Sequence, residues 1–164
     1  MRILGIDPGL QITGYGVIEL ANPLYPKLID AGVIRLDNSQ SIPQRLAELE
    51  SELDELIGEC KPDVCAVEQL YSHYKHPRTA ILMGHARGVI LLLAARRKIR
   101  IAEFAANRVK QSVSGNGHAS KLQVQRAIQA VWKLKDPPEP PDVADALAVA
   151  LCCGRSLMVA DRRE

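Results

Sequence analysis

Three strand-like segments precede a regular alternation of helices and strands, and this order limits the folds that the chain can adopt. The first segment is the apolar run at residues 3–6, which ends at Asp7-Pro8-Gly9 and reads as a buried strand followed by a turn. Residues 13–20 and 27–36 are two further strand candidates. The turn-like residues 21–23 between them predict a hairpin.

The rest of the chain alternates helical and strand-like patterns. An amphipathic helix is predicted from Ile42 to Ile57, and a second buried strand is predicted at residues 64–68. Further segments follow: a helix at 79–97, a strand at 99–104, and helices at 106–113, 120–134 and 142–157. Hairpins followed by strand–helix alternation predict an α/β fold, in which a five-stranded mixed sheet is flanked by helices.

Length and composition agree with one cytoplasmic globular domain. With 164 residues, the chain is expected to form a single domain over residues 1–157, with a frayed tail at 158–164. The hydrophobic share of 47% excludes a disordered chain. We expect no membrane span, because no stretch of about 18 uncharged apolar residues occurs, and we expect no signal peptide. The cysteines form no C-x-x-C pair and are predicted to be buried, reduced side chains: Cys60, Cys65, Cys152 and Cys153.

The charge of the chain is unevenly distributed. Residues 71–130 contain eleven Lys or Arg and a single acid, Glu103, whereas the remainder of the chain is acidic. All four histidines fall in the same block. This basic block suggests a polyanionic partner, although a solvated helix surface would have the same composition.

Two acidic side chains stand at the ends of apolar strands. Asp7 ends the first strand and Glu68 ends the fourth. If these strands are parallel neighbours joined by a right-handed crossover, both acids lie at the edge where α/β proteins bind ligands. The alternative for Asp7 is a simple turn with Pro8 and Gly9, and Glu68 could be a surface residue.

A second acidic pair begins the last predicted helix. Asp142 and Asp145 are three residues apart and therefore face the same way. Asp142 could instead be an N-cap, and Asp145 a first-turn acid favoured by the helix dipole. Four carboxylates without a matching lysine must be protonated or hold a hard cation, and Mg²⁺ prefers oxygen ligands. Two such ions about 3.5–4 Å apart stabilise both the attacking and the leaving oxygen in phosphodiester cleavage.

Six short segments, spread from Ile3 to about Cys153, resemble the RuvC family of Holliday-junction resolvases. They are Gly5-Ile6-Asp7-Pro8-Gly9, Thr13-Gly14-Tyr15-Gly16, Val67-Glu68-Gln69, Ala86-Arg87-Gly88, Val109-Lys110-Gln111 and Asp142-Val143-Ala144-Asp145-Ala146-Leu147-Ala148. The resemblance implies an RNase H-like fold, a homodimer and paired symmetric nicking of four-way DNA junctions in recombination and repair. It also implies docking on a branch-migration complex of the RuvA and RuvB type.

The resemblance assigns roles to individual residues. The family's catalytic, metal-binding acids correspond to Asp7, Glu68, Asp142 and Asp145, with two Mg²⁺ ions per site, for which Mn²⁺ substitutes. Its two important basic residues correspond to Lys110 and Lys121. Tyr71 occupies the position of a family phenylalanine that stacks near the junction centre, and the ring is kept. In the same region, Lys75 and Arg78 are expected to contact DNA. The products are expected to carry 5′-phosphate and 3′-hydroxyl ends.

Three other functions compete with this interpretation. A nuclease of the same fold that processes ribosomal RNA precursors shares the strand-end aspartate, but the Asp-x-x-Asp helix start, Tyr71 and the two lysines favour a junction resolvase. A sugar-kinase or actin-like domain needs a second lobe and a further glycine-rich loop, for which 164 residues leave no room. A junction-binding module without activity has no reason to collect four acids beside phosphates.

Overall fold

The computed structural model describes residues 1–21, 25–70 and 77–161. Its strands and helices occur in the predicted order, and their ends lie within a few residues of the predicted ones. The elements are β1 (Arg2–Asp7), β2 (Ile12–Glu19), β3 (Lys27–Arg35), α1 (Ile42–Cys60), β4 (Val64–Glu68), α2 (Pro77–Arg96), β5 (Arg100–Phe104), α3 (Ala106–Ser114), α4 (Lys121–Trp132) and α5 (Pro141–Asp161). The last helix continues four residues beyond the predicted end at Leu157.

The five strands form one mixed sheet in the order β3-β2-β1-β4-β5. The β1–β2 and β2–β3 pairs are antiparallel, as the hairpin interpretation predicts. Strands β1 and β4 are parallel neighbours, and β4 pairs in parallel with β5. The predicted α/β fold with a five-stranded mixed sheet is therefore confirmed, and the parallel β1–β4 pair sets the edge at which Asp7 and Glu68 end.

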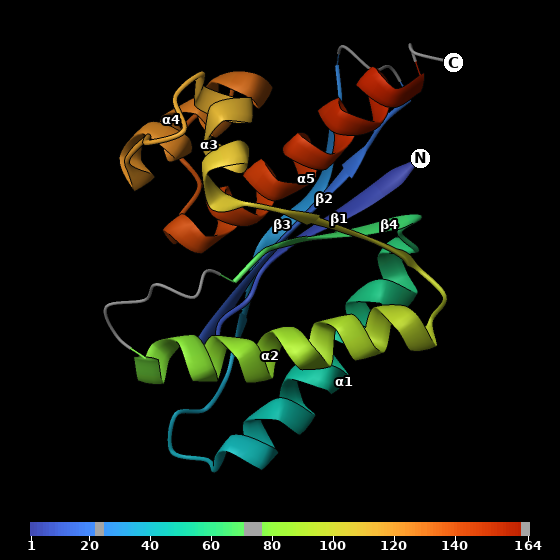
Figure 1. The fold of residues 1–164 in the computed structure, drawn as a ribbon, viewed down its shortest axis with the longest axis vertical. Helices are drawn as coiled ribbons and strands as arrows, with labels where there is room; N and C mark the ends of the chain where they lie inside the picture. Colours follow the sequence, from blue (N-terminus) through green and yellow to red (C-terminus); the bar gives the residue numbers. More distant parts are fainter. Residues whose placement is uncertain (22–24, 71–76, 162–164) are drawn as a thin grey trace.

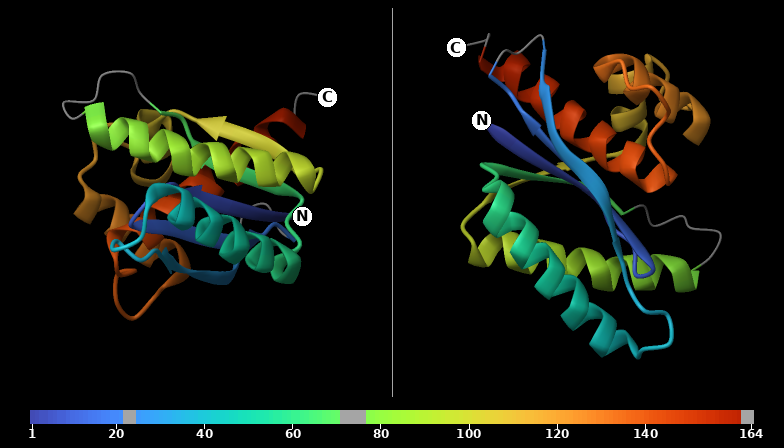
Figure 2. Two further views of the ribbon diagram at one scale, coloured as in Figure 1. Left: turned by 90° about the horizontal axis from the view of Figure 1, so that it is seen from below. Right: turned by 180° about the vertical axis from the view of Figure 1, so that it is seen from behind.

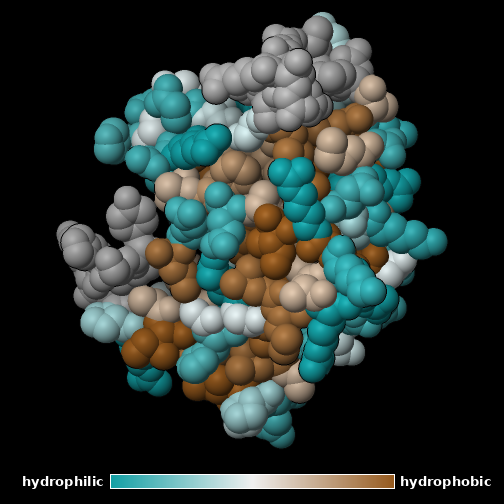
Figure 3. Space-filling view, turned by 45° about the vertical axis from the view of Figure 1, so that its right-hand side comes forward, coloured by the Kyte–Doolittle hydropathy of each residue, from teal (hydrophilic) through white to brown (hydrophobic). Residues whose placement is uncertain are grey.

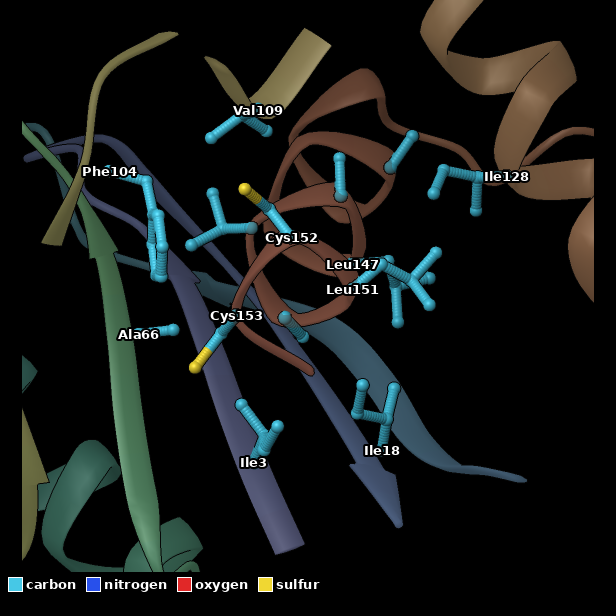
Figure 4. Packing of buried hydrophobic residues seen from close by; sticks show 14 of the residues in the cluster. Ile3, Ile18, Ala66, Phe104, Val109, Ile128, Leu147, Leu151, Cys152 and Cys153 are labelled. Atoms are coloured by element: carbon cyan, nitrogen blue, oxygen red, sulfur yellow. The ribbon is translucent and has the colours of Figure 1, made fainter. Parts of the chain in front are cut away.

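Helices cover both faces of the sheet, as Figures 1 and 2 show. Helices α1 and α2 pack on one face over a core that includes Leu4, Ile6 and Val17. The other face carries α3, α4 and α5 over Ile3, Ile18 and the apolar side of α5. All four cysteines are buried, and Figure 4 shows Cys153 between α5 and the sheet, close to Ile3.

Helix α5 lies unusually close to the strands beneath it because glycines face it. A Cβ atom added to Gly5 would lie 2.2 Å from the Ala146 carbonyl oxygen. One added to Gly14 would lie 2.1 Å from the Asp142 carbonyl oxygen, and one added to Gly16 would lie 2.5 Å from Leu147 Cδ2. Any side chain at these positions would push the helix away, so the glycines of two of the family-like segments fix the height of α5 above the sheet.

Helix α2 exposes an apolar stripe to solvent. Among the described helices it is the one long and apolar enough to cross a membrane by length and composition, with a mean hydropathy of 1.3 and only 22% of that window buried. Its exposed residues Ile81, His85, Gly88, Leu92 and Ala95 recur at spacings of four and three. Ile81 and Leu92 are 61% and 52% exposed. Figure 3 shows apolar surface through the middle and lower parts of the visible face, and both α1 and α2 lie in the lower part of the molecule in Figure 1.

Candidate active site

A cleft of about 790 Å³ lies at the edge of the sheet where β1 and β4 end. Asp7 and Glu68 both line it. Because Ile6 pairs with Val67 in the parallel register, the two acids follow at adjacent positions on neighbouring strands. The strand-end prediction for these two carboxylates is therefore confirmed in its geometry.

The turn after β1 is held closed by Thr13, which is fully buried. Its hydroxyl donates a hydrogen bond of 2.6 Å to the Gly9 carbonyl oxygen and accepts one of 3.2 Å from the Gly9 N–H. A Cβ atom at Gly9 would lie 2.1 Å from the Ile12 carbonyl oxygen. The turn therefore has a structural role as well, which is to fix the end of the strand that carries Asp7.

Asp142 and Asp145 enter the same cleft from the start of α5. The helix begins at Pro141, which puts Asp142 inside its first turn, so the N-cap alternative for Asp142 is wrong. The close approach at Gly14 holds the Asp142 backbone directly over β2. Three separate segments of the chain thus bring four carboxylates to one place.

Burial and like charge make three of these carboxyl groups, Asp7, Glu68 and Asp145, hard to ionise. Burial is the largest effect on Asp7, followed by Asp145, Glu68 and Asp142, and together they raise its pKa to about 8. Burial also raises the pKa of Glu68 and of Asp145, although Lys110 and Lys121 oppose this shift. A site of this kind favours a bound cation or protonation over four free negative charges.

Two lysines line the cleft beside the acids. Lys110 comes from α3, and Lys121 is the first residue of α4. The Lys121 Nζ lies 3.7 Å from Asp145 Oδ2. The expectation that no lysine matches the carboxylates is therefore wrong, because tertiary packing brings the start of α4 to the start of α5. Lys121 remains 70% exposed and is available to an anion in the cleft.

Much of the basic block has a structural role. Arg97 forms two hydrogen bonds to Asp54 of α1, and Arg96 Nη1 lies 2.9 Å from Glu50 Oε1. Arg87 pairs with Glu103 of β5. The solvated-surface alternative for the charge block is therefore correct for part of it. Among the described basic residues of the block, Lys110 and Lys121 are the two that line the cleft.

Arg87 connects α2 to the strand end that carries Glu68. Its side chain is only 17% exposed, and its Nε donates to the Glu68 carbonyl oxygen at 3.4 Å. The same guanidinium pairs with Glu103, so α2, β4 and β5 meet at this arginine. Arg87 therefore positions the backbone of Glu68, which gives the Ala86-Arg87-Gly88 segment a physical role.

Of the remaining predicted DNA contacts, Arg78 is among the described residues and does not line this cleft. Arg78 is exposed on the first turn of α2, one residue before Thr79, which does line the cleft. Tyr71 and Lys75 lie outside the described residues. The cleft also contains residues that no sequence motif indicated, namely Arg45, Thr79, Leu82 and Met83. They belong to helices α1 and α2, whose apolar patterns show which side of the helix faces the core but not which residues line a cleft.

The donor set fits a hard cation by its chemistry. Four half-buried carboxylates at this edge supply oxygen ligands only, and burial raises the pKa of Asp7, Glu68 and Asp145. Over the described parts of the chain, no three acidic, histidine or cysteine side chains are grouped closely enough to define a metal position by themselves. Ligation would therefore require these side chains to turn toward a common point.

Comparisons with known proteins agree over most of the chain. Residues 3–153 match a family model described as crossover junction endodeoxyribonuclease RuvC. The chain is 49% identical to the protein of that name from Rhodopirellula baltica, over 92% of this chain and 84% of the relative. It is 45% identical to the one from Caldicellulosiruptor saccharolyticus, over 93% and 91% of the two chains.

Solved structures give the same answer. The structure of T. thermophilus RuvC in complex with a Holliday junction substrate matches with a TM-score of 0.89 and 28% identity, over 98% of this chain and 96% of that one. The yeast mitochondrial Holliday junction resolvase Ydc2 has a TM-score of 0.69 at 14% identity, over 98% and 82% of the chains, which shows a shared fold. The predicted RNase H-like class is thereby confirmed.

Proposed function

The chain belongs to the RuvC family of crossover junction endodeoxyribonucleases, and from this premise we propose that it resolves four-way DNA junctions by paired symmetric nicks in recombination and repair. The observation that carries the proposal is the convergence of Asp7, Glu68, Asp142 and Asp145 in one cleft beside two lysines. The reported relatives carry the name of a junction resolvase, so the alternative of a ribosomal RNA nuclease gains no support from them.

Nucleases of this family are metal-dependent, and the four acids are the residues that would hold the metal. We assign two Mg²⁺ ions per site, with Mn²⁺ as a substitute, because the donors are all carboxylate oxygens. When bound, such ions activate the attacking water and stabilise the leaving oxygen. Hydrolysis of this type leaves 5′-phosphate and 3′-hydroxyl ends.

The chain's own side chains bind and orient the DNA strand. Lys110 and Lys121 bind backbone phosphates as point charges and thereby offset the repulsion between DNA and the four acids. Thr13 and Arg87 hold the strand ends that carry Asp7 and Glu68. Near the junction centre, Tyr71 would stack on a base, and Lys75 and Arg78 would contact the DNA.

Paired nicks require two active sites, and α2 offers the surface that would bring two copies together. Its exposed residues Ile81, Gly88 and Leu92 belong to a stripe with the four-and-three spacing used in helix–helix packing. Among the described residues, nothing lies within 4 Å of a Cβ atom added at Gly88, and the Gly84 position has only an ordinary contact with Leu70. Neither glycine is required by packing within that part of the chain, which supports a homodimer across this face.

The cellular location and the partner complex are expectations that come from the family. A junction resolvase works where DNA is recombined, so a cytoplasmic location and docking on a branch-migration complex of the RuvA and RuvB type remain predictions of family membership.

The test is a nicking assay with a synthetic four-way junction and a linear duplex of the same sequence. We expect metal-dependent nicks at symmetric positions in the junction and little cleavage of the duplex. The Asp7→Asn variant serves as the inactive control. Equal cleavage of junction and duplex, or activity that persists in chelator, would contradict the proposed function.

A further inference from the structure

Arg45 places a positive charge on the wall of the cleft that lies opposite Lys110 and Lys121. It is the fourth residue of α1 and lines the cleft together with the turn at residues 9–12. Helix α1 covers one face of the sheet, whereas the helices that carry the two lysines cover the other. Arg45 therefore lines the cleft from the α1 side of the sheet, whereas Lys110 and Lys121 line it from the α5 side, next to the carboxylates.

The guanidinium of Arg45 has a buried nitrogen without a partner. Its Nε is buried and makes no hydrogen bond to any described residue. Arg87, Arg96 and Arg97 differ in this respect, since each forms an ion pair. A buried N–H without an acceptor is costly, and a phosphate oxygen of a DNA strand in the cleft would supply the acceptor that Nε needs.

The cleft has the size and lining to hold more than the scissile phosphate. Its volume is about 790 Å³, and apolar side chains of Leu10, Ile12, Leu82 and Met83 share its lining with Arg45 and the acids. A sugar or base can lie against such side chains while the phosphates on either side meet charged groups. A guanidinium suits a phosphate because its Nε and one terminal nitrogen can donate side by side to two oxygens.

We propose that Arg45 binds a backbone phosphate flanking the scissile one, on the α1 wall of the cleft, so that the strand to be cut is held from both sides. The inference rests on the proposed nuclease function, because it takes DNA as the ligand of the cleft. It adds a binding residue that none of the six family-like segments contains.

Two acids lie near Arg45: Asp37, whose pKa the Arg45 charge helps to lower although its hydrogen bonds go to Ser39, and Glu48, three residues further along the same helix. The competing explanation is a local ion pair, for which Glu48 is the candidate partner. Glu48 Oε2 is also buried without a partner, and no contact within 4 Å joins the two groups among the described residues. If their attraction were the purpose of Arg45, removing either charge would lower protein stability and leave DNA binding unchanged.

The test compares Arg45→Ala, Arg45→Lys and Glu48→Gln by the salt dependence of junction binding in chelator, where no cleavage occurs. Arg96→Ala is the matched control, since it removes an arginine from an exposed helical position of α2, where its partner is Glu50. Lys110→Ala is the positive control for a phosphate contact. Thermal unfolding of every variant reports its stability.

We expect Arg45→Ala to reduce the slope of log K against log salt by about one unit and to weaken binding about tenfold at moderate salt. Arg45→Lys should keep most of the slope, and Glu48→Gln and Arg96→Ala should keep all of it. A parental slope in Arg45→Ala, with junction cleavage intact, would overturn this inference and leave the proposed function standing. A parental protein that neither binds nor cuts the junction would instead refute the proposed function.

Discussion

Replacing Asp7 by Asn should stabilise the metal-free protein and abolish its activity. Asn has nearly the same shape but cannot ionise, so it removes the charge that Glu68, Asp142 and Asp145 repel. We expect nicking to fall at least about a hundredfold, which corresponds to about 2.7 kcal/mol of activation free energy. Junction binding in chelator should be retained or become slightly tighter.

The magnitude of the stability gain follows from the raised pKa of Asp7. Its pKa moves from 3.8 to about 8 on folding, so the folded protein holds a proton that the unfolded chain has lost. The resulting penalty is absent below pH 3.8, grows as the pH rises and is complete above about pH 8. At about 1.36 kcal/mol per pH unit, its upper bound at pH 7 is about 4 kcal/mol. Water in the cleft solvates the charged form, and we therefore expect a gain of about 1–2 kcal/mol in the variant.

The assay is denaturant unfolding in chelator at pH 4, 6 and 8. The difference in free energy of unfolding between Asp7→Asn and the parent should be near zero at pH 4 and largest at pH 8. Asp136→Asn is the matched control because Asp136 is exposed and does not line the cleft. The reasoning fails if Asp7→Asn is less stable than the parent at pH 8, or if its advantage does not grow with pH.

Three further changes test other parts of the site. Ca²⁺ in place of Mg²⁺ should support junction binding but little nicking, because Ca²⁺ is the larger ion and its coordination geometry is less strictly defined. Equal nicking rates with both ions would refute this. Arg87→Ala should slow nicking at least about tenfold, and Glu103→Gln, which leaves the contact with the Glu68 carbonyl, should slow it less; equal effects would show that only the ion pair matters. Leu92→Glu should convert the proposed dimer to a monomer in sedimentation, because it places like charges in the α2 stripe; a dimeric mass in the variant would exclude this face.

Local sequence pattern determined the elements of the fold. The helical spacing of apolar residues in Ile42–Cys60 reflects burial on one side, and the structure has a helix there. The uninterrupted apolar run of Val64–Val67 reflects burial on both sides, and the structure has a strand there. The edge position of Asp7 and Glu68 was also predictable. A parallel pair of strands joined by a helix puts both carboxyl ends at one edge, whichever side chains fill the core.

Tertiary packing decided what the sequence pattern left open. Asp142 looked equally like a helix cap, and only the start of α5 at Pro141 and its contact with Gly14 place it in the first turn over the sheet. The basic block looked like one surface. In the structure Arg96 and Arg97 pair with acids of α1, whereas Lys121 meets Asp145 in the cleft.

The position of Arg45 in the cleft also could not be predicted from the sequence. In the sequence it is one polar residue among many on an amphipathic helix, and its spacing reports only that it avoids the core. Its place on the cleft wall depends on how α1 packs against the sheet beside the turn after β1. Spacing along one segment records which side of that segment is buried. Packing between elements decides which groups from distant segments meet at a site. The distance between those segments along the sequence does not predict that packing.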